Sequence, residues 1–99
     1  MFELDSRLHD DTYFVCDLAL CRVLLMNDSQ FPWLILVPRK NDLAEIVDLA
    51  DEEQIVLLRE SALVSRVMQT LFAPHKLNVG ALGNVVRQLH VHHIARFED

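Results

Sequence analysis

The sequence predicts an α+β fold, an antiparallel sheet of about five strands covered on one face by a single long helix. Three observations predict it: short apolar runs bounded by turn residues over 13–38, helical periodicity over 51–72, and two more strand-like runs after the helix. The chain has 99 residues and is 52% hydrophobic, which is enough for one core. We therefore expect one domain over residues 1–99.

The first two strands are expected at residues 13–18 and 20–26, joined as a hairpin. Both runs are rich in Val and Leu, and the turn-favouring run Asn27-Asp28-Ser29 closes the second. Residues 32–38 follow as an apolar segment with a proline at each end. Because proline cannot donate to a sheet, this segment suits a third strand that is buried on both faces and ends at the prolines.

Residues 51–72 are the expected long helix, with a helical turn or two before it at 43–49. Asp51 is the expected N-cap, and Pro74 stops the helix. We expect the apolar stripe to pack on the sheet, and its spare width could serve a dimer. The stripe consists of Ile55, Leu58, Ala62, Ser65, Met68 and Phe72, with Val64, Val67 and Leu71 widening it.

Two more strands are expected after the helix, at residues 76–82 and 87–96, with a bend at Gly83-Asn84 between them. Gly80 and Gly83 are the two glycines of the chain, and both lie close to His90 in sequence. The backbone there is expected to need positive φ or to approach a ligand closely, although a role in turns alone fits equally well.

The last expected strand holds three of the five histidines, in the run Gln88-Leu89-His90-Val91-His92-His93-Ile94. Because strand side chains alternate, Gln88, His90 and His92 should share one face, and His93 should point the other way. An imidazole can attack phosphorus or hold a phosphoryl oxygen near neutral pH. The run therefore predicts phosphoryl chemistry at His90 and His92.

This run resembles the signature of the histidine triad (HIT) superfamily, in which three histidines alternate with apolar residues. The resemblance extends to Leu77-Asn78-Val79-Gly80, the Asn27 turn, the strand at 33–38 and the acidic start of the long helix, in the same order. It implies a HIT-like fold and a homodimer. It also implies a hydrolase or transferase that releases a nucleoside monophosphate, expected to carry a purine, from a leaving group through a covalent nucleotidyl-histidine. No cofactor is required in that chemistry.

The resemblance assigns roles position by position. His90 matches the histidine that attacks the α-phosphorus, and His92 matches the one that bonds to the phosphate and the departing group. Gln88 stands at the first triad position, as in HIT branches with glutamine there, and is included among the catalytic residues as a support for His90 or a ligand contact. The nucleotide-binding positions implied are Asn27 near the ribose, and Asn78, Gly83 and Asn84 near the phosphate.

The chain departs from the HIT pattern in four places. Gln88 has no pKa near neutrality, and Trp33 stands where many relatives have a histidine that orients the nucleophile. A backbone carbonyl or another side chain must then set the tautomer of His90. His93 replaces a usual apolar residue and is not counted as catalytic. The chain also ends at Asp99, where relatives usually continue through a tail that we expect to be absent here.

Two other functions stay open. Gln88 and Trp33 together would also fit a nucleotide-binding module with weak or no catalysis. A metal-binding protein is the less favoured alternative, because His-x-His places two imidazoles on one face as zinc ligands often are. A third ligand is needed, and neither the position two residues after His92 nor Glu98 supplies one at a recognisable spacing. We therefore predict no metal site.

Composition limits the classes of partner and the cellular location to be expected. The net charge of −6 argues against a protein that grips long nucleic acid, where a basic face is expected. The longest apolar run, residues 31–38, is far shorter than the roughly 20 residues that cross a bilayer. Cys16 and Cys21, with no secretory signal pattern at the N-terminus, indicate a cytoplasmic protein with reduced thiols.

Overall fold

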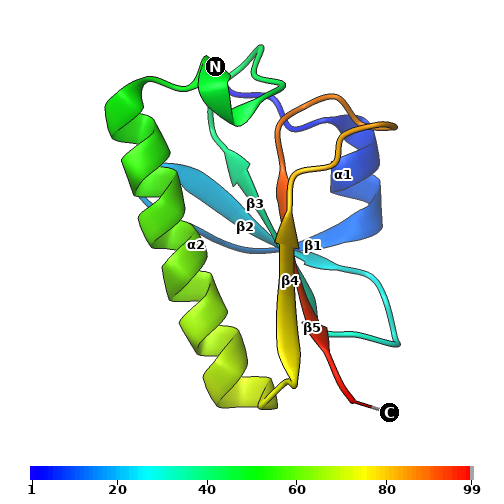
Figure 1. Ribbon diagram of the computed structural model, residues 1–99. Helices are drawn as coiled ribbons and strands as arrows, with labels where there is room; N and C mark the ends of the chain where they lie inside the picture. The colour runs from blue at the N-terminus through cyan, green and yellow to red at the C-terminus, as the bar shows by residue number, and fades with distance from the viewer. Residues whose placement is uncertain (99) are drawn as a thin grey trace.

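The computed structural model describes residues 1–98 and contains one sheet with helices on both sides (Figure 1). The elements in chain order are α1 (Ser6–Asp11), β1 (Thr12–Asp17), β2 (Cys21–Met26), β3 (Trp33–Pro38), the 3₁₀ helix η1 (Ile46–Asp48), α2 (Asp51–Phe72), β4 (Lys76–Gly80) and β5 (Val91–Arg96). All strand pairs are antiparallel, in the order β1-β2-β3-β5-β4. The predicted fold class and the predicted span of the long helix are both confirmed.

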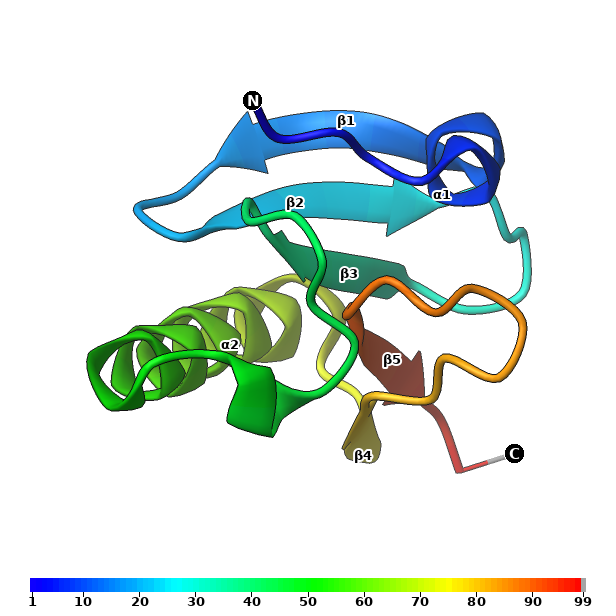
Figure 2. The ribbon, with the colours of Figure 1, turned by 90° about the horizontal axis from the view of Figure 1, so that it is seen from above.

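The central strand β3 is buried on both faces, as its apolar sequence predicts. Ile35, Leu36 and Val37 have no exposed surface. Leu36 belongs to the main core between the sheet and α2, whereas Ile35 and Val37 belong to a second core on the opposite face. Figure 2 shows α2 on one side of the sheet and α1, with the segment 81–90, on the other. The sheet thus separates two different environments.

The start of α2 differs from the prediction. Ala50, not Asp51, is the N-cap residue, and the Glu53 carboxylate accepts a hydrogen bond of 3.0 Å from the Ala50 N–H. A glutamate three residues after the cap satisfies one of the free N–H groups at the helix start without a polar cap side chain. The helix ends as predicted before Pro74, with Ala73 in the left-handed conformation.

The apolar stripe of α2 is wider than the face that the sheet covers. The residues that are buried are Leu57, Glu60, Val64 and Met68. Ile55 and Leu58, which the periodicity assigned to the core, are 53% and 72% exposed. They lie on the flank of the helix that faces β4, and among residues 1–98 they line a hollow there with Ile46 and Val79.

A buried carboxylate ties α2 to the turn between β1 and β2. Glu60 accepts hydrogen bonds from the N–H groups of Leu20 and Cys21, at 3.0 and 2.9 Å. Burial, with Glu60 beside it, raises the pKa of the Cys21 thiol far above its ordinary value. Cys21 is therefore an inert core residue, whereas Cys16 is exposed.

The last strand is shorter than predicted. β5 begins at Val91, opposite Leu36 of β3, and residues 87–90 belong to the loop before it. Leu89 donates its N–H to the Leu43 carbonyl, so this part of the backbone pairs with another loop and not with β3. Side-chain alternation therefore cannot be extended back from His92 to Gln88.

One of the two glycines has the backbone conformation expected. Gly83 adopts φ of 78°, and an added Cβ would lie 3.3 Å from the Val86 carbonyl oxygen. Gly80 has an ordinary φ, and a Cβ there would meet open space. The prediction of positive φ is therefore confirmed for Gly83 and wrong for Gly80, whereas close approach to a ligand stays a prediction.

The helix α1 is the element that the sequence pattern did not reveal. It has only six residues, and the Asp5 carboxylate caps it by accepting from the Arg7 N–H at 2.8 Å. Leu8 is its buried residue and packs into the second core. A helix this short buries too little apolar surface to produce a visible periodicity.

Candidate functional site

A cavity of about 500 Å³ lies on the face of the sheet that α1 covers. Its walls come from α1, from Met26 at the end of β2, from Trp33 at the start of β3, and from the loop 82–86. His90 and His92 complete the lining. The volume is within the range of small-molecule sites.

His90 has its proton position fixed by the backbone. Its Nδ1 lies 2.6 Å from the carbonyl oxygen of Gln88. A carbonyl oxygen can only accept, so Nδ1 carries the proton and donates it. The other ring nitrogen, Nε2, then keeps a free lone pair, as a nucleophile requires.

His92 has the opposite arrangement. The indole Nε1 of Trp33 lies 3.0 Å from His92 Nδ1. An indole N–H can only donate, so Nδ1 is the acceptor, and the single proton of the neutral ring sits on Nε2. Burial, together with the neighbouring His90 and His93, lowers the pKa of His92 to about 4. His92 is therefore neutral at pH 7.

The two imidazoles lie edge to face, with ring centroids 4.8 Å apart. His90 presents a lone pair and His92 presents an N–H, and both side chains line the same cavity. Such a pair can attack an electrophilic phosphorus with one ring and donate to an oxygen on it with the other.

His93 points to the opposite face, as alternation predicts, and is fully buried against α2. Its Nδ1 lies 3.2 Å from the Val91 carbonyl, and its Nε2 lies 2.7 Å from Ser61 Oγ. Nδ1 therefore donates, and Nε2 accepts from the hydroxyl. Burial lowers the pKa of His93, which is a neutral, fully bonded core residue.

Within residues 1–98 no three His, Cys, Asp or Glu side chains come close enough together to hold a metal ion. At His90 and His92, one ring nitrogen of each is already hydrogen-bonded within the protein. In the same part of the chain, no helix combines the length and the apolar character needed to cross a membrane.

Comparison with protein families gives one clear match, because residues 7–99 fit the HIT domain. The chain belongs to the HIT family. HIT proteins bind nucleotides and are generally hydrolases or transferases. No curated protein is similar enough to count as a relative.

Solved HIT structures share the fold closely. A histidine triad protein from Marinobacter aquaeolei VT8 is 52% identical, with a TM-score of 0.96 over 98% of this chain and 71% of that one. Histidine triad proteins from Bradyrhizobium japonicum and Sinorhizobium meliloti 1021 are 48% and 47% identical, also with TM-scores of 0.96. These two alignments cover 97% and 98% of this chain and 72% of each of those chains.

The first position of the HIT signature, Gln88, does not place its side chain beside the two histidines. Its Oε1 accepts from the Asp5 N–H at 2.8 Å, and its Nε2 donates to the Glu3 carbonyl at 2.9 Å. The predicted shared face is wrong, because residue 88 precedes the strand. The side chain ties down the N-terminal segment, and only the carbonyl of Gln88 faces His90.

The predicted nucleotide-binding residues divide into two groups. Gly83 and Asn84 line the cavity. Asn27 and Asn78 are exposed and do not line it. Asn78 is the middle residue of β4, and its Oδ1 lies 3.4 Å from an Arg96 guanidinium nitrogen.

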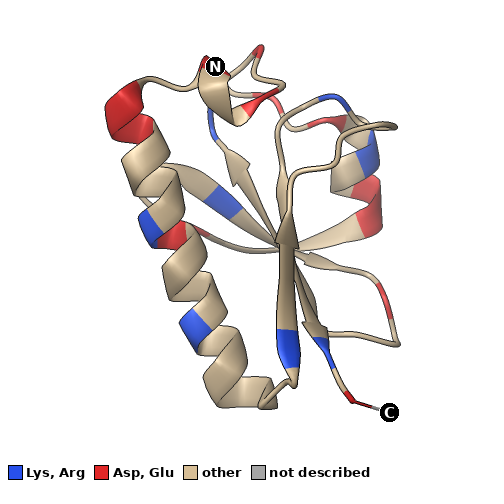
Figure 3. Cartoon of the chain, viewed as in Figure 1, with Lys and Arg blue, Asp and Glu red and all other residues tan. Residues whose placement is uncertain are grey.

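Sequence reasoning missed the contribution of α1 to the site. Arg7 and Asp11 line the cavity, and the Arg7 guanidinium lies 3.4 Å from the Val85 carbonyl. Figure 3 shows the basic and acidic segments of α1 following one another along the helix. Because α1 lacks a recognisable pattern, only the Asp5 cap could have indicated it.

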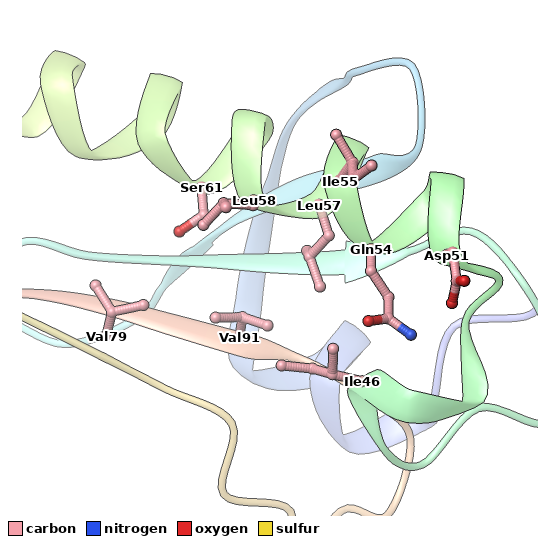
Figure 4. A pocket seen from close by; sticks show the side chains of 9 residues that line it. All are labelled: Ile46, Asp51, Gln54, Ile55, Leu57, Leu58, Ser61, Val79 and Val91. Carbon is pink, nitrogen blue, oxygen red and sulfur yellow. The ribbon is translucent and has the colours of Figure 1, made fainter.

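A second hollow, of about 510 Å³, lies between α2, η1 and the strands β4 and β5 (Figure 4). Ile46, Ile55, Leu58 and Val79 line it and are 42 to 72% exposed. Neither of the two triad histidines lines it, and it borders β4, one of the two edge strands of the sheet.

Proposed function

We propose that this HIT protein is a hydrolase or transferase that cleaves a nucleoside monophosphate, with a purine as the expected base, from a leaving group. The bond cut is a phosphoanhydride, phosphoramidate or phosphosulfate, and the intermediate is nucleotidyl-His90. The observation that carries the proposal is the pair of opposite tautomers in one cavity, with a free lone pair on His90 Nε2 beside the N–H of His92.

In this mechanism His90 Nε2 attacks the α-phosphorus and the bond to the leaving group breaks. The His92 Nε2–H donates to the oxygen that gains charge, and main-chain N–H groups near Gly83 and Asn84 stabilise the phosphoryl oxygens. Water then displaces His90. The Gln88 carbonyl keeps the proton on His90 Nδ1 and stabilises the ring when attack makes it cationic. These donors belong to the chain, so we propose that neither a metal nor a cofactor is required.

The nucleotide itself is proposed to occupy the part of the cavity under α1. Leu8, Met26 and Val86 give that part an apolar surface suited to a base. Asn27 comes directly after Met26, which supports the ribose contact that the family implies. Asn78 would need to act through its backbone or through movement of β4, since its side chain lies outside the cavity.

The test is incubation with adenosine 5′-phosphosulfate, adenosine 5′-phosphoramidate and diadenosine tetraphosphate. We expect release of AMP, and acid-labile labelling of His90 located by peptide mapping after rapid quenching. Addition of EDTA should leave the rate unchanged. Turnover with no label on His90, or label on another residue, would contradict the covalent mechanism.

The second candidate is a nucleotide-binding module without useful catalysis. It is favoured by Trp33 and Gln88, neither of which can carry a proton away from the triad histidines. Saturable AMP binding by calorimetry, with no turnover of any of the three conjugates, would establish it in place of the enzyme.

We also propose that the protein is a cytoplasmic homodimer. Free cysteines support the location. Two features support the dimer, the exposed apolar hollow beside α2 and the open edge of β4. A second copy of the chain would cover the hollow and continue the sheet at β4. Leu58→Lys should give a monomer by analytical ultracentrifugation, while Leu82→Lys, equally exposed on the opposite face, should not.

A further inference from the structure

The hydrogen bond between Trp33 and His92 restricts the chemistry of the site. The indole N–H occupies His92 Nδ1, and Trp33 has no acceptor to receive a proton in return. Protonating His92 would place two N–H groups against each other. The ring can therefore become an imidazolium only if this contact breaks.

We infer that Trp33 is a positioning residue that holds His92 as a neutral Nε2–H donor, so that the site selects conjugates whose leaving group departs as an anion. The suitable leaving groups are phosphate, sulfate and carboxylate, and amines are disfavoured. This inference rests on the proposed function and narrows its substrate class.

The other charged and titratable groups around His92 agree with this assignment. The ring centroid of His90 lies 4.8 Å from that of His92, and Arg7 of α1 lines the same cavity. Both groups disfavour a positive charge on His92. His93 stands next to it on β5 and is buried. Asp11 of α1 is the acidic residue of the lining, but it is exposed, and solvent weakens its attraction.

The chemical step makes the selection explicit. His90 Nε2 forms a bond to phosphorus while the bond to the leaving group breaks, and the leaving group takes the electron pair. Sulfate, phosphate and carboxylate are stable as anions at pH 7 and need only the hydrogen bond from His92. An amine must take up a proton as the P–N bond breaks, and a neutral Nε2–H supplies it poorly. In the second half, water attacks phosphorus, the bond to His90 breaks, and the proton lost by water goes to solvent.

The first experiment measures the tautomer directly and requires no turnover. In ¹⁵N-edited NMR of the full chain, His92 should show a protonated Nε2 and an unprotonated Nδ1 from pH 8 down to pH 5. Trp33→Phe removes the donor and keeps an aromatic ring, and it should give a mixture of tautomers with a higher pKa at His92. A protonated Nδ1 in the wild type, or an unchanged tautomer in Trp33→Phe, would overturn the role of Trp33.

The second experiment compares kcat/KM for adenosine 5′-phosphosulfate and adenosine 5′-phosphoramidate. Each kcat/KM is divided by the rate constant for attack of free imidazole on the same conjugate, which corrects for intrinsic reactivity. The wild type should favour the phosphosulfate by about 10²-fold, the size of a missing general-acid contribution. In Trp33→His, the new imidazole can accept as well as donate, so His92 can be protonated, and the preference should fall by about tenfold.

The outcomes separate this inference from the proposed function. A wild-type ratio near one, or the same ratio in Trp33→His, would overturn the selection while leaving His90 catalysis intact. If neither conjugate is turned over, the proposed function fails and the substrate selection fails with it. The NMR measurement then still decides whether Trp33 fixes the tautomer.

Discussion

His92 and His93 are neighbours on one strand and lie in two different regions of the molecule. His92 faces the cavity under α1, and one of its ring nitrogens is hydrogen-bonded to Trp33. His93 faces α2, and both of its ring nitrogens are engaged, by Ser61 and the Val91 carbonyl. Burial lowers the pKa of both. The number of free ring nitrogens, and not burial, therefore separates a reactive histidine from a structural one.

The largest expected effect is on turnover, from His90→Asn. The variant removes the nucleophile, and we expect kcat to fall by at least about 10³-fold. The free energy of unfolding should change by less than about 1.5 kcal/mol, because Asn can keep a hydrogen bond to the Gln88 carbonyl. Single-turnover kinetics and urea denaturation measure the two quantities.

The control for this prediction is His93→Gln, which changes an adjacent histidine on the other face of β5. Its activity per folded molecule should stay within about threefold of the wild type, since His93 does not line the cavity. A comparable loss of kcat in both variants would mean that the two faces are not chemically distinct.

The next effect is on stability, from His93→Ala. The change leaves a cavity between the sheet and α2 and removes the partner of the Ser61 hydroxyl. We expect a loss of about 2–4 kcal/mol in the free energy of unfolding. Urea denaturation measures it, with Ser61→Ala as the milder matched change at about 1 kcal/mol. Equal losses in the two variants would mean that the His93 ring adds no packing.

The two faces of the sheet, one toward the cavity and one toward α2, also show which features the sequence predicts correctly. The strong periodicity of residues 51–72 and the apolar run before Pro38 determine α2 and β3, because each buries a long apolar surface. Alternation within β5 correctly separates His92 from His93. The α1 contribution was missed because six residues carry too little pattern to recognise.

A third prediction concerns pH. The folded-state pKa of His92, about 4, lies below the ordinary value of 6.5, so the unfolded chain takes up the proton first as pH falls. Stability is therefore complete above pH 6.5 and decreases toward pH 4. Between pH 7.5 and 5 the loss from His92 should be about 2 kcal/mol, and His93 adds to it in the same direction.

Urea midpoints at pH 7.5, 6 and 5 measure this dependence. His92→Asn should reduce the drop, because Asn has no proton to gain. A drop of the same size in that variant would assign the pH dependence to other groups.

The smallest effect is expected from Gln88→Ala. It removes the two side-chain hydrogen bonds to the N-terminal segment, at Glu3 and Asp5, and should cost about 1–2 kcal/mol in the free energy of unfolding. The backbone carbonyl that bonds to His90 remains, so kcat should fall by less than about threefold. A loss of kcat above about tenfold would show that the Gln88 side chain acts in catalysis after all.

The part of the site that sequence could not predict depends on loops. The prediction that Gln88 shares the catalytic face requires a strand that begins before Val91, but the backbone there, at Leu89, pairs with Leu43 of another loop. Similarly, no pattern reveals that Trp33 donates to His92, because the contact joins residues 59 positions apart. Backbone pairings of loops depend on the assembled fold and leave no periodic mark.

The chain contains a single tryptophan, and its indole N–H is bonded to the imidazole beside the proposed nucleophile. Emission excited in the indole band therefore originates at one point of the molecule. Any event that alters His92 or fills the adjoining space should change its intensity or colour. The protein thus carries an optical reporter of its own site, and titrations can be followed without a dye or a label.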